Sequence, residues 1–328
     1  MTMKHLLVVA ICLMGCSKAN TISDGDETGD PTWGQQPALP VVEGTVNLNM
    51  TGDEHFVNAM SNAQPRIPNF PALTVKPNVL SGYVADLAGK PLKGAYIGVR
   101  VTAIGGSYTS VQAETNDKGY YEMSLPIGGC SYFANGYVMD YNGTQTVVGL
   151  RPSDGKMESF ASGTGAVKNF IMQSYGPADP DDVSAQPQNS NNYYGGAIYF
   201  SYNVDWDSNL PNNLPKNGEI QIELIPDGKG IFGENRTFKV TKQIGYSGAS
   251  IVNIPVGRYT IKVKLKDNRE LKLKEVGPYA NNYPALGLLP KVATGSASVL
   301  FIPEWQKTKS MVSAYKGNWM ALNIGLSL

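Results

Sequence analysis

The feature that most constrains this chain is a series of short runs in which apolar and polar residues alternate. Residues 219–225 alternate strictly, and residues 96–101 and 260–265 follow the same period of two. Because successive side chains of a β-strand point to opposite faces of a sheet, this period buries one face and leaves the other polar. We therefore expect an all-β fold of short strands that pack as sandwiches.

Turn sequences separate these runs and indicate the domain boundaries. Residues 86–91 and 116–119 carry glycine and proline where tight turns need positive or preset φ angles. Residues 176–192 are polar, contain proline and have no periodicity, as is typical of a linker. We predict two β-sandwich domains, preceded by an irregular, proline-rich edge segment that wraps the first of them. The predicted bounds are 41–78 for the edge segment, 79–175 for the first sandwich and 193–328 for the second.

The first predicted domain resembles the carboxypeptidase-regulatory-like family over roughly 95 residues. The residues that carry the resemblance are Gly82, Val84, Asp86, Gly89, Pro91, Leu92, Gly94, Ala95, Ile97 and Val99, then Thr115, Asn116, Asp117, Gly119, Tyr121, Leu125 and Pro126. Modules of that family are transthyretin-like β-sandwiches, so the resemblance implies this fold for residues 79–175. Residues 128–148 do not follow the family's short ending, which leaves the loops there open.

The N-terminus has the pattern of a secretory signal. Lys4 is followed by an apolar stretch over residues 6–14, shorter than the about 20 residues that span a bilayer. The sequence Leu-Met-Gly that ends at Cys16 resembles the bacterial lipobox, in which the signal is removed and the cysteine becomes a lipidated N-terminus. The resemblance implies a signal peptide over residues 1–15 and a lipid anchor at Cys16. The alternative is an ordinary signal peptide, or a buried apolar start, that happens to contain cysteine.

Residues 16–40 are polar and interrupted by proline, so we expect them to form a flexible tether. Lys18 with Asp24, Asp26 and Glu27 loosely resembles the export signal of surface lipoproteins of the Bacteroidetes. This resemblance implies a protein of the bacterial outer membrane that is held by lipid and exposed at the cell surface. A periplasm-facing position is the alternative.

The charge balance argues against nucleic acid as a partner. Once Lys4 leaves with the signal, 26 of the 27 basic residues remain beside 27 acidic ones. Proteins that bind nucleic acid concentrate positive charge, which this composition does not provide. The expected partners are the membrane, through the lipid anchor, and a glycan or another envelope protein.

Few residues suit catalysis or metal binding. Cys130 and His55 are the only cysteine and histidine that follow Cys16. A reactive thiol needs a cationic neighbour, and a histidine-based zinc site needs at least two histidines. His55 is followed by Phe-Val-Asn, so the His-x-x-Glu pair of zinc carboxypeptidases is absent from this position. We predict a protein without cofactor or metal that is not an enzyme; an enzyme that uses two carboxylates alone is the remaining catalytic alternative.

Aromatic residues provide the candidate binding site. Tyr202, Asp205, Trp206 and Asp207 lie together in a segment rich in Asp, Ser, Asn and Pro. Exposed rings beside polar groups can hold a sugar ring by stacking and hydrogen bonds. The alternatives are that the aromatic residues here and near residues 305–319 fill the core, and that residues 205–209 form a calcium loop. The calcium pattern lacks the glycine and the glutamate that such loops carry.

A lysine-rich hairpin and exposed strand edges are two further candidates. Lys262, Lys264 and Lys266 alternate with apolar residues, and Lys272 and Lys274 continue the pattern after a turn. This face is either solvated or a patch for an acidic glycan, while an exposed edge strand could receive a partner's strand. Taken together, the sequence predicts a non-catalytic binding or scaffold module of the cell envelope, with glycan capture for a polysaccharide-uptake system as the alternative.

Overall fold

The computed structural model describes residues 33–328 except 62, 208–209, 246–247, 278–279 and 305–307. The chain divides into the units Met1–Pro31 and Thr32–Leu328, and every described residue belongs to the second. Strands hold 48% of the residues and helices 5%, so the predicted all-β sandwich fold is confirmed. Among the described residues no helix has the length and apolarity to cross a membrane. Cys16 and the predicted signal peptide lie outside the described residues.

One group of strands forms the N-terminal sandwich, which consists of two five-stranded sheets. The first sheet has the order β10-β7-β4-β5, with β8 beside β7, and the second has the order β11-β3-β12-β9, with β6 beside β3. Alternate residues such as Val84, Ile97 and Phe170 meet between the sheets in the core. The strands are β3 (Val79–Asp86), β4 (Tyr96–Thr102), β5 (Tyr108–Glu114), β6 (Tyr120–Ser124), β7 (Gly129–Tyr141), β8 (Thr144–Gly149), β9 (Arg151–Pro152), β10 (Phe160–Ala161), β11 (Ala166–Val167) and β12 (Phe170–Met172).

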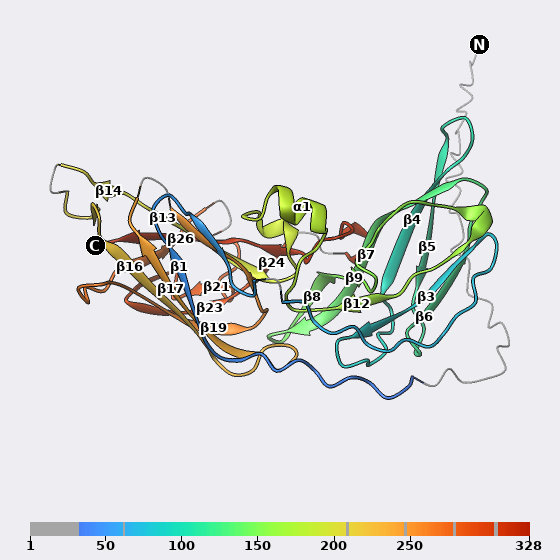
Figure 1. The fold of residues 1–328 in the computed structure, drawn as a ribbon, viewed down its shortest axis with the longest axis horizontal. Helices are drawn as coiled ribbons and strands as arrows, with labels where there is room; N and C mark the ends of the chain where they lie inside the picture. Colours follow the sequence, from blue (N-terminus) through green and yellow to red (C-terminus); the bar gives the residue numbers. More distant parts are fainter. Residues whose placement is uncertain (1–32, 62, 208–209, 246–247, 278–279, 305–307) are drawn as a thin grey trace, which may run out of the picture. The chain divides into compact units, whose positions relative to one another are not determined.

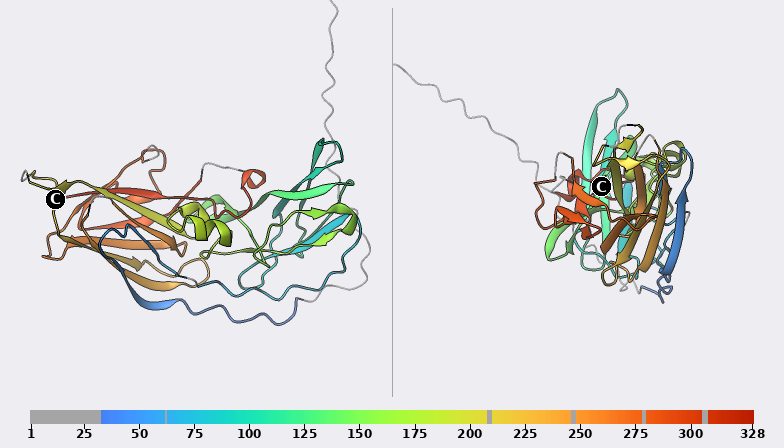
Figure 2. Two further views of the ribbon diagram at one scale, coloured as in Figure 1. Left: turned by 45° about the horizontal axis from the view of Figure 1, so that its top comes forward. Right: turned by 90° about the vertical axis from the view of Figure 1, so that its left-hand side faces the viewer.

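The other group forms the C-terminal sandwich, which consists of two six-stranded sheets of order β1-β17-β16-β19-β23-β21 and β2-β18-β13-β26-β20-β22. Ile222, Val263 and Ile324 are among the apolar residues between them. Both sandwiches can be followed in Figures 1 and 2. The strands are β1 (Glu43–Met50), β2 (Phe56–Asn58), β13 (Gly196–Tyr202), β16 (Glu219–Pro226), β17 (Asn235–Gln243), β18 (Ala249–Ile254), β19 (Arg258–Leu265), β20 (Lys272–Glu275), β21 (Gly287–Leu289), β22 (Val292–Thr294), β23 (Ser296–Leu300) and β26 (Leu322–Ser327).

The sequence predicts that the segment before the first sandwich wraps that sandwich. Its two strands instead belong to the C-terminal sandwich. Its strand β1 pairs in parallel with β17, and its strand β2 pairs in parallel with β18. Both are edge strands, but they belong to the two opposite sheets of the C-terminal sandwich. Met50, at the end of β1, is 1% exposed and contributes to that sandwich's core. Edge pairing to a strand about 190 residues away cannot be read from local periodicity.

Residues on both sides of β1 and β2 return to the N-terminal sandwich. Trp33 packs against Phe70 and Tyr83 with ring centroids 5.5 Å apart in each pair. The Gln36 amide donates to the carbonyl of Asn69 at 3.0 Å and accepts from its backbone N–H at 2.9 Å. Residues 33–40 are therefore packed, which corrects the predicted flexible tether for this part. We call residues 33–78 the strap, because they contact both sandwiches.

A second crossing lies near the C-terminus. Strands β24 (Ile302–Pro303) and β25 (Trp319–Met320) form a small antiparallel pair that flanks the 3-10 helix η3 (Lys309–Met311). Lys309 donates to the carbonyl of Gly94 at 2.7 Å, and Val312 accepts from the backbone N–H of Asn135 at 3.1 Å. Residues of the predicted second domain thus pack on the N-terminal sandwich, and the domain boundary is less sharp than the linker composition indicated.

The predicted linker is ordered. It contains the short helix α1 (Pro180–Ala185) and the 3-10 helix η2 (Ser190–Asn192), while η1 (Ser162–Thr164) lies in the N-terminal sandwich. Asp179 caps α1 by accepting from the backbone N–H of Asp181 at 2.9 Å. The Asn192 amide donates to the carbonyls of Asp182 and Gln186, which holds the segment closed on itself.

The lysine-rich hairpin differs from its prediction. The turn after β19 forms, with Asn268 at a φ of 71° and the backbone N–H of Leu265 donating to the carbonyl of Arg269. However, β19 and β20 continue into opposite sheets of the sandwich. Lys262 and Lys264 therefore lie on one sheet, and Lys272 and Lys274 on the other, so the five lysines do not share one face.

Candidate functional site

The solvent face of the β1-β17-β16-β19-β23 sheet is a polar surface whose positions are set by the strand register. The outward positions of one row are Asn47, Lys239, Glu223, Lys262 and Ser296, which are successive register partners. The alternate positions of β16 and β19 are apolar and mostly buried, and on β17 Phe238 and Val240 are buried in the same way. The period of two that was predicted for residues 219–225 therefore produces this face directly. We call it the polar face.

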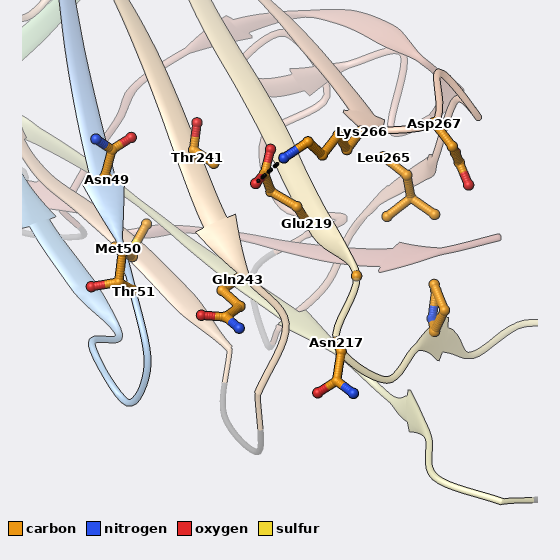
Figure 3. A pocket seen from close by; sticks show the side chains of 12 residues that line it. Asn49, Met50, Thr51, Asn217, Glu219, Thr241, Gln243, Leu265, Lys266 and Asp267 are labelled. Atoms are coloured by element: carbon orange, nitrogen blue, oxygen red, sulfur yellow. Dashed lines mark hydrogen bonds and ion pairs between the residues drawn. The ribbon is translucent and has the colours of Figure 1, made fainter.

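Two hollows lie on the polar face. The face pocket, of about 630 Å³, lies over the middle of the strands and is lined by Gln221, Glu223, Lys239, Lys262 and Lys264 among others. The end pocket, of about 550 Å³, lies where the strands end. Figure 3 shows the residues around the end pocket, which come from strand ends and turns.

The end pocket is lined by polar groups from four strand termini. Asn49 comes from the end of β1, Gln243 from the end of β17 and Glu219 from the start of β16. Asn217 occupies the turn before β16 at a φ of 63°, a left-handed conformation that asparagine tolerates better than most residues. Lys266 follows β19 and donates to Glu219 at 3.1 Å, a contact drawn in Figure 3.

The charges on this surface are balanced. The two pockets are lined by four lysines, Lys239, Lys262, Lys264 and Lys266, and by four acids, Glu219, Glu223, Asp267 and Glu270. Lys239 pairs with Glu223 at 2.7 Å and Lys266 with Glu219 at 3.1 Å. Hydrogen bonding from the Arg269 side chain, more than its charge, lowers the pKa of the Asp267 carboxyl. A mixed surface of this kind favours a neutral polar ligand over an acidic one.

The predicted aromatic site adjoins the end pocket. Asp205 ends β14 (Val204–Asp205), which pairs in parallel with β15 (Leu214–Pro215), and Pro215 lines the pocket. Trp206 follows directly, is 37% exposed, and has the Lys216 ammonium 5.1 Å from its ring centroid. A cation over an indole ring is attracted by the ring's quadrupole. This contact orients a partly exposed ring on a segment whose paired strand reaches the pocket at Pro215.

The other members of the predicted site are less accessible. Tyr202 is half-buried at the end of β13, and burial raises the pKa of its phenol. Asp207 is exposed and Asp205 is half-buried, while Ser208 and Asn209 lie outside the described residues. Within the described part of the chain no group of three or more His, Cys, Asp or Glu side chains could hold a metal ion.

Most of the remaining aromatic residues pack inside the protein. Tyr193 and Tyr194 are buried, and Trp319 is buried with its ring 5.0 Å from that of Tyr141. Tyr199 is half-buried and its hydroxyl accepts from the backbone N–H of Ser190 at 3.2 Å. Trp305 lies outside the described residues. The alternative that these rings fill the core therefore holds for residues 193, 194 and 319.

The cysteine, the histidine and the buried carboxylates that catalysis could use can each be placed in the fold. Cys130 is buried, and burial raises the pKa of its thiol, which disfavours the thiolate. His55 is exposed and stacks at its edge with Phe56. The buried carboxylate Glu275 accepts from the backbone N–H of Leu288 at 2.7 Å and from Lys291 at 2.8 Å.

In the part of the chain that the structure describes, Glu234 is the second buried carboxylate. It also accepts hydrogen bonds from nearby groups. It accepts from the backbone N–H of Phe232 at 2.9 Å and from the hydroxyl of Ser174. Each of the two buried acids thus joins segments of the fold through hydrogen bonds. Both carboxylates therefore stabilise the fold through hydrogen bonds.

Comparisons with known proteins add little to this geometry. No protein-family model and no curated protein matches the chain. The Bacillus anthracis TIE protein is 18% identical and matches over 57% of this chain and 28% of its own, with a TM-score of 0.22. A bacterial adhesin from Mobiluncus mulieris with intramolecular disulfide, isopeptide and ester bond cross-links is 10% identical over 71% of this chain and 84% of its own, with a TM-score of 0.24.

The major pilin from Streptococcus pyogenes is 11% identical over 76% of this chain and 96% of its own, with a TM-score of 0.17. This chain spans little more than a quarter of the TIE protein's length. Similarities at these TM-scores carry no argument about ligand or partner. The resemblance of residues 79–175 to the carboxypeptidase-regulatory-like family stays a prediction.

Proposed function

We propose that this chain is a non-catalytic, lipid-anchored protein of the bacterial cell envelope that acts as a binding or scaffold module. The N-terminal pattern that ends at Cys16 supports the anchor. The observation that carries the binding role is the polar face, where outward side chains of five paired strands are held in fixed register. A site built on paired strands is more rigid than one built on loops.

The anchor is tested by Cys16→Ser and by globomycin, which blocks removal of lipoprotein signals. Acylation predicts that either treatment moves the protein out of the detergent-soluble membrane fraction or leaves the precursor uncleaved. Protease treatment of intact cells then separates surface exposure from a periplasm-facing position. An unmodified chain in the cytosol of untreated cells would contradict the proposal.

Neutral glycan is the second, more specific candidate ligand. It is favoured by the partly exposed Trp206, which follows a strand paired with pocket residue Pro215, and by the paired charges of the polar face. Stacking of a sugar ring on the indole would combine with hydrogen bonds from Asn49, Gln243 and Asn217. The predicted acidic-glycan patch is less well supported, because Glu219 neutralises Lys266 and because Lys272 and Lys274 lie on the opposite sheet.

A glycan array with the folded protein tests this second proposal. We expect Trp206→Ala to weaken binding of a neutral oligosaccharide by about tenfold, since one stacked ring contributes about 1–1.5 kcal/mol. Gln243→Ala should weaken the same ligand, whereas Ser110→Ala, on exposed strand β5, should leave binding unchanged. Absence of binding at millimolar glycan would remove this candidate and leave the scaffold role.

A further inference from the structure

The outer face of the second sheet of the N-terminal sandwich carries two buried polar side chains. Arg151 in β9 is the register partner of Ile171 in β12, and Gln173 lies two residues further along the chain. Arg151 and Gln173 are therefore diagonal neighbours on one face, within reach of each other's long side chains. Phe170 and Met172 point to the opposite face, into the core. Arg151 and Gln173 are each 6% exposed.

The strap and the C-terminal half cover this polar pair. The Arg151 guanidinium donates to the Gln64 amide oxygen at 3.4 Å, which is a long hydrogen bond. A Cβ atom added to Gly176 would lie 3.2 Å from Pro65 and 3.1 Å from the Gln173 amide nitrogen. The Tyr194 hydroxyl donates to the carbonyl of Leu150, the residue before Arg151, at 3.3 Å. Four segments of the chain thus converge on the pair.

The hydrogen-bonding capacity of the pair is largely unused by the described residues. Nε and Nη1 of Arg151, and both amide atoms of Gln173, are buried without a hydrogen-bond partner in that part of the chain. A guanidinium has five N–H donors and no acceptor. A buried cation without a partner costs several kcal/mol. The unmet groups are therefore mainly donors around a positive charge.

In the described part of the chain the other buried cation, Lys242, is satisfied, and so is the half-buried Lys291. Lys242, buried in β17, donates to the carbonyls of Glu54 at 2.6 Å and Gly52 at 3.4 Å. Lys291 pairs with the buried Glu275 at 2.8 Å. The surroundings of Arg151 therefore differ from those that this fold otherwise gives to a buried positive charge.

The carboxylate whose charge acts on Arg151, that of Asp154, is engaged elsewhere. Asp154 pairs with Lys168 at 2.7 Å and accepts from the backbone N–H of Lys156 at 3.1 Å. Asp154 therefore does not supply the two parallel hydrogen bonds that a guanidinium makes with a well-placed oxyanion.

We propose that Arg151 and Gln173 form a binding site for a small oxyanion, a carboxylate or a phosphate group, enclosed beneath the strap. The oxygen atoms of such a group accept along one edge of the guanidinium, from Nη2 together with either Nε or Nη1 of Arg151, and Gln173 donates its amide N–H. The anion neutralises the buried guanidinium and ties the sheet to the strap and to the residues around Tyr194. This site lies on a different sandwich from the polar face and is independent of the proposed function.

Thermal unfolding of the full chain in different anions tests the site. At constant ionic strength in fluoride, we expect acetate, sulfate or inorganic phosphate to raise the midpoint temperature with the logarithm of the anion concentration. Calorimetric titration with whichever anion raises the midpoint should give one site per chain. Acetate acting alone assigns a carboxylate ligand, and phosphate acting alone assigns a phosphate ligand.

Variants separate this site from general salt effects. Gln173→Leu should weaken the anion affinity by about tenfold or more, since a hydrogen bond to a charged group contributes about that factor. Arg151→Met should abolish the anion dependence, and Arg151→Lys should restore only part of it. Arg100→Met, which removes an exposed guanidinium 4.6 Å from the Tyr108 ring, should behave as the unchanged protein does.

Three outcomes would overturn the proposal. The first is a midpoint temperature that responds equally to every anion, with the same response in the unchanged protein and in Gln173→Leu. That result is expected if ordered water, and not an anion, accepts from the guanidinium. The second is an anion effect that appears only in Asp154→Asn, which would mean that Asp154 pairs with Arg151 in solution. The third is titration of the unchanged protein with acetate and with phosphate that gives no heat for either anion.

Discussion

Replacing Met50 with alanine tests whether strand β1 completes the core of the C-terminal sandwich. Met50 is 1% exposed, and its register partner in β17 is Lys242. Truncating a core methionine to alanine costs about 2–5 kcal/mol. Met50 also lines the end pocket, so water can reach part of the space that the substitution opens. We therefore expect the lower half of that range, about 2–3 kcal/mol.

This loss corresponds to a fall in the midpoint temperature of about 4–10 °C for a folded unit of this size. Circular dichroism during heating measures the fall in midpoint temperature. Urea unfolding with an unchanged m-value measures the loss of unfolding free energy. Asn47→Ala is the matched control, because Asn47 lies on the same strand but points to solvent. It should change stability by no more than about 0.5 kcal/mol. Equal behaviour of the two variants would refute the placement of β1 in this core.

Three further substitutions or titrations have defined outcomes. A Cβ at Gly149 would overlap the carbonyl oxygen of Lys316, so Gly149→Ala should destabilise the protein by about 1–3 kcal/mol in urea, whereas Gly129→Ala, whose Cβ meets open space, should change it by less than about 1 kcal/mol. Glu275→Gln should cost about 3 kcal/mol by the same assay, since it leaves Lys291 without its buried partner, while Asp117→Asn in an exposed pair should cost less than about 1 kcal/mol. Burial raises the pKa of Tyr175 to about 12, so its contribution to stability is complete below pH about 10 and is lost as the pH rises toward 12. Phenolate absorbance that appeared near pH 10 for every tyrosine of the folded protein would contradict that burial.

The local elements were predictable because their signals are local. The turns at Gly89 and Gly119 form with φ angles of 79° and 72°, as the positions of these glycines in the sequence indicate. The alternating runs at residues 96–101, 219–225 and 260–265 are the strands β4, β16 and β19. In each case the period of two specified which side chains point to the core.

The pairing of distant segments was not predictable from the same signals. Alternation in β1 indicates a strand but does not identify β17 as its partner, since an edge can be completed by any strand of suitable register. The end pocket was missed for a related reason: Asn49, Glu219 and Gln243 are ordinary polar residues at strand ends, and only the register brings them together. Trp206 was singled out because Asp, Ser, Asn and Pro surround it in the sequence, and its binding role stays a prediction.

Because β1 pairs in parallel with β17, β1 cannot join its sheet until β17 has been synthesised. A chain that emerges N-terminus first presents residues 43–50 long before residues 235–243 exist to receive them. Non-local contacts of this kind slow folding and keep strand edges exposed in the meantime. A fragment that begins at residue 193 would lack both β1 and β2 and leave β17 and β18 with open edges prone to aggregation. The last half of this protein therefore depends on its first sixty residues to become a finished sandwich.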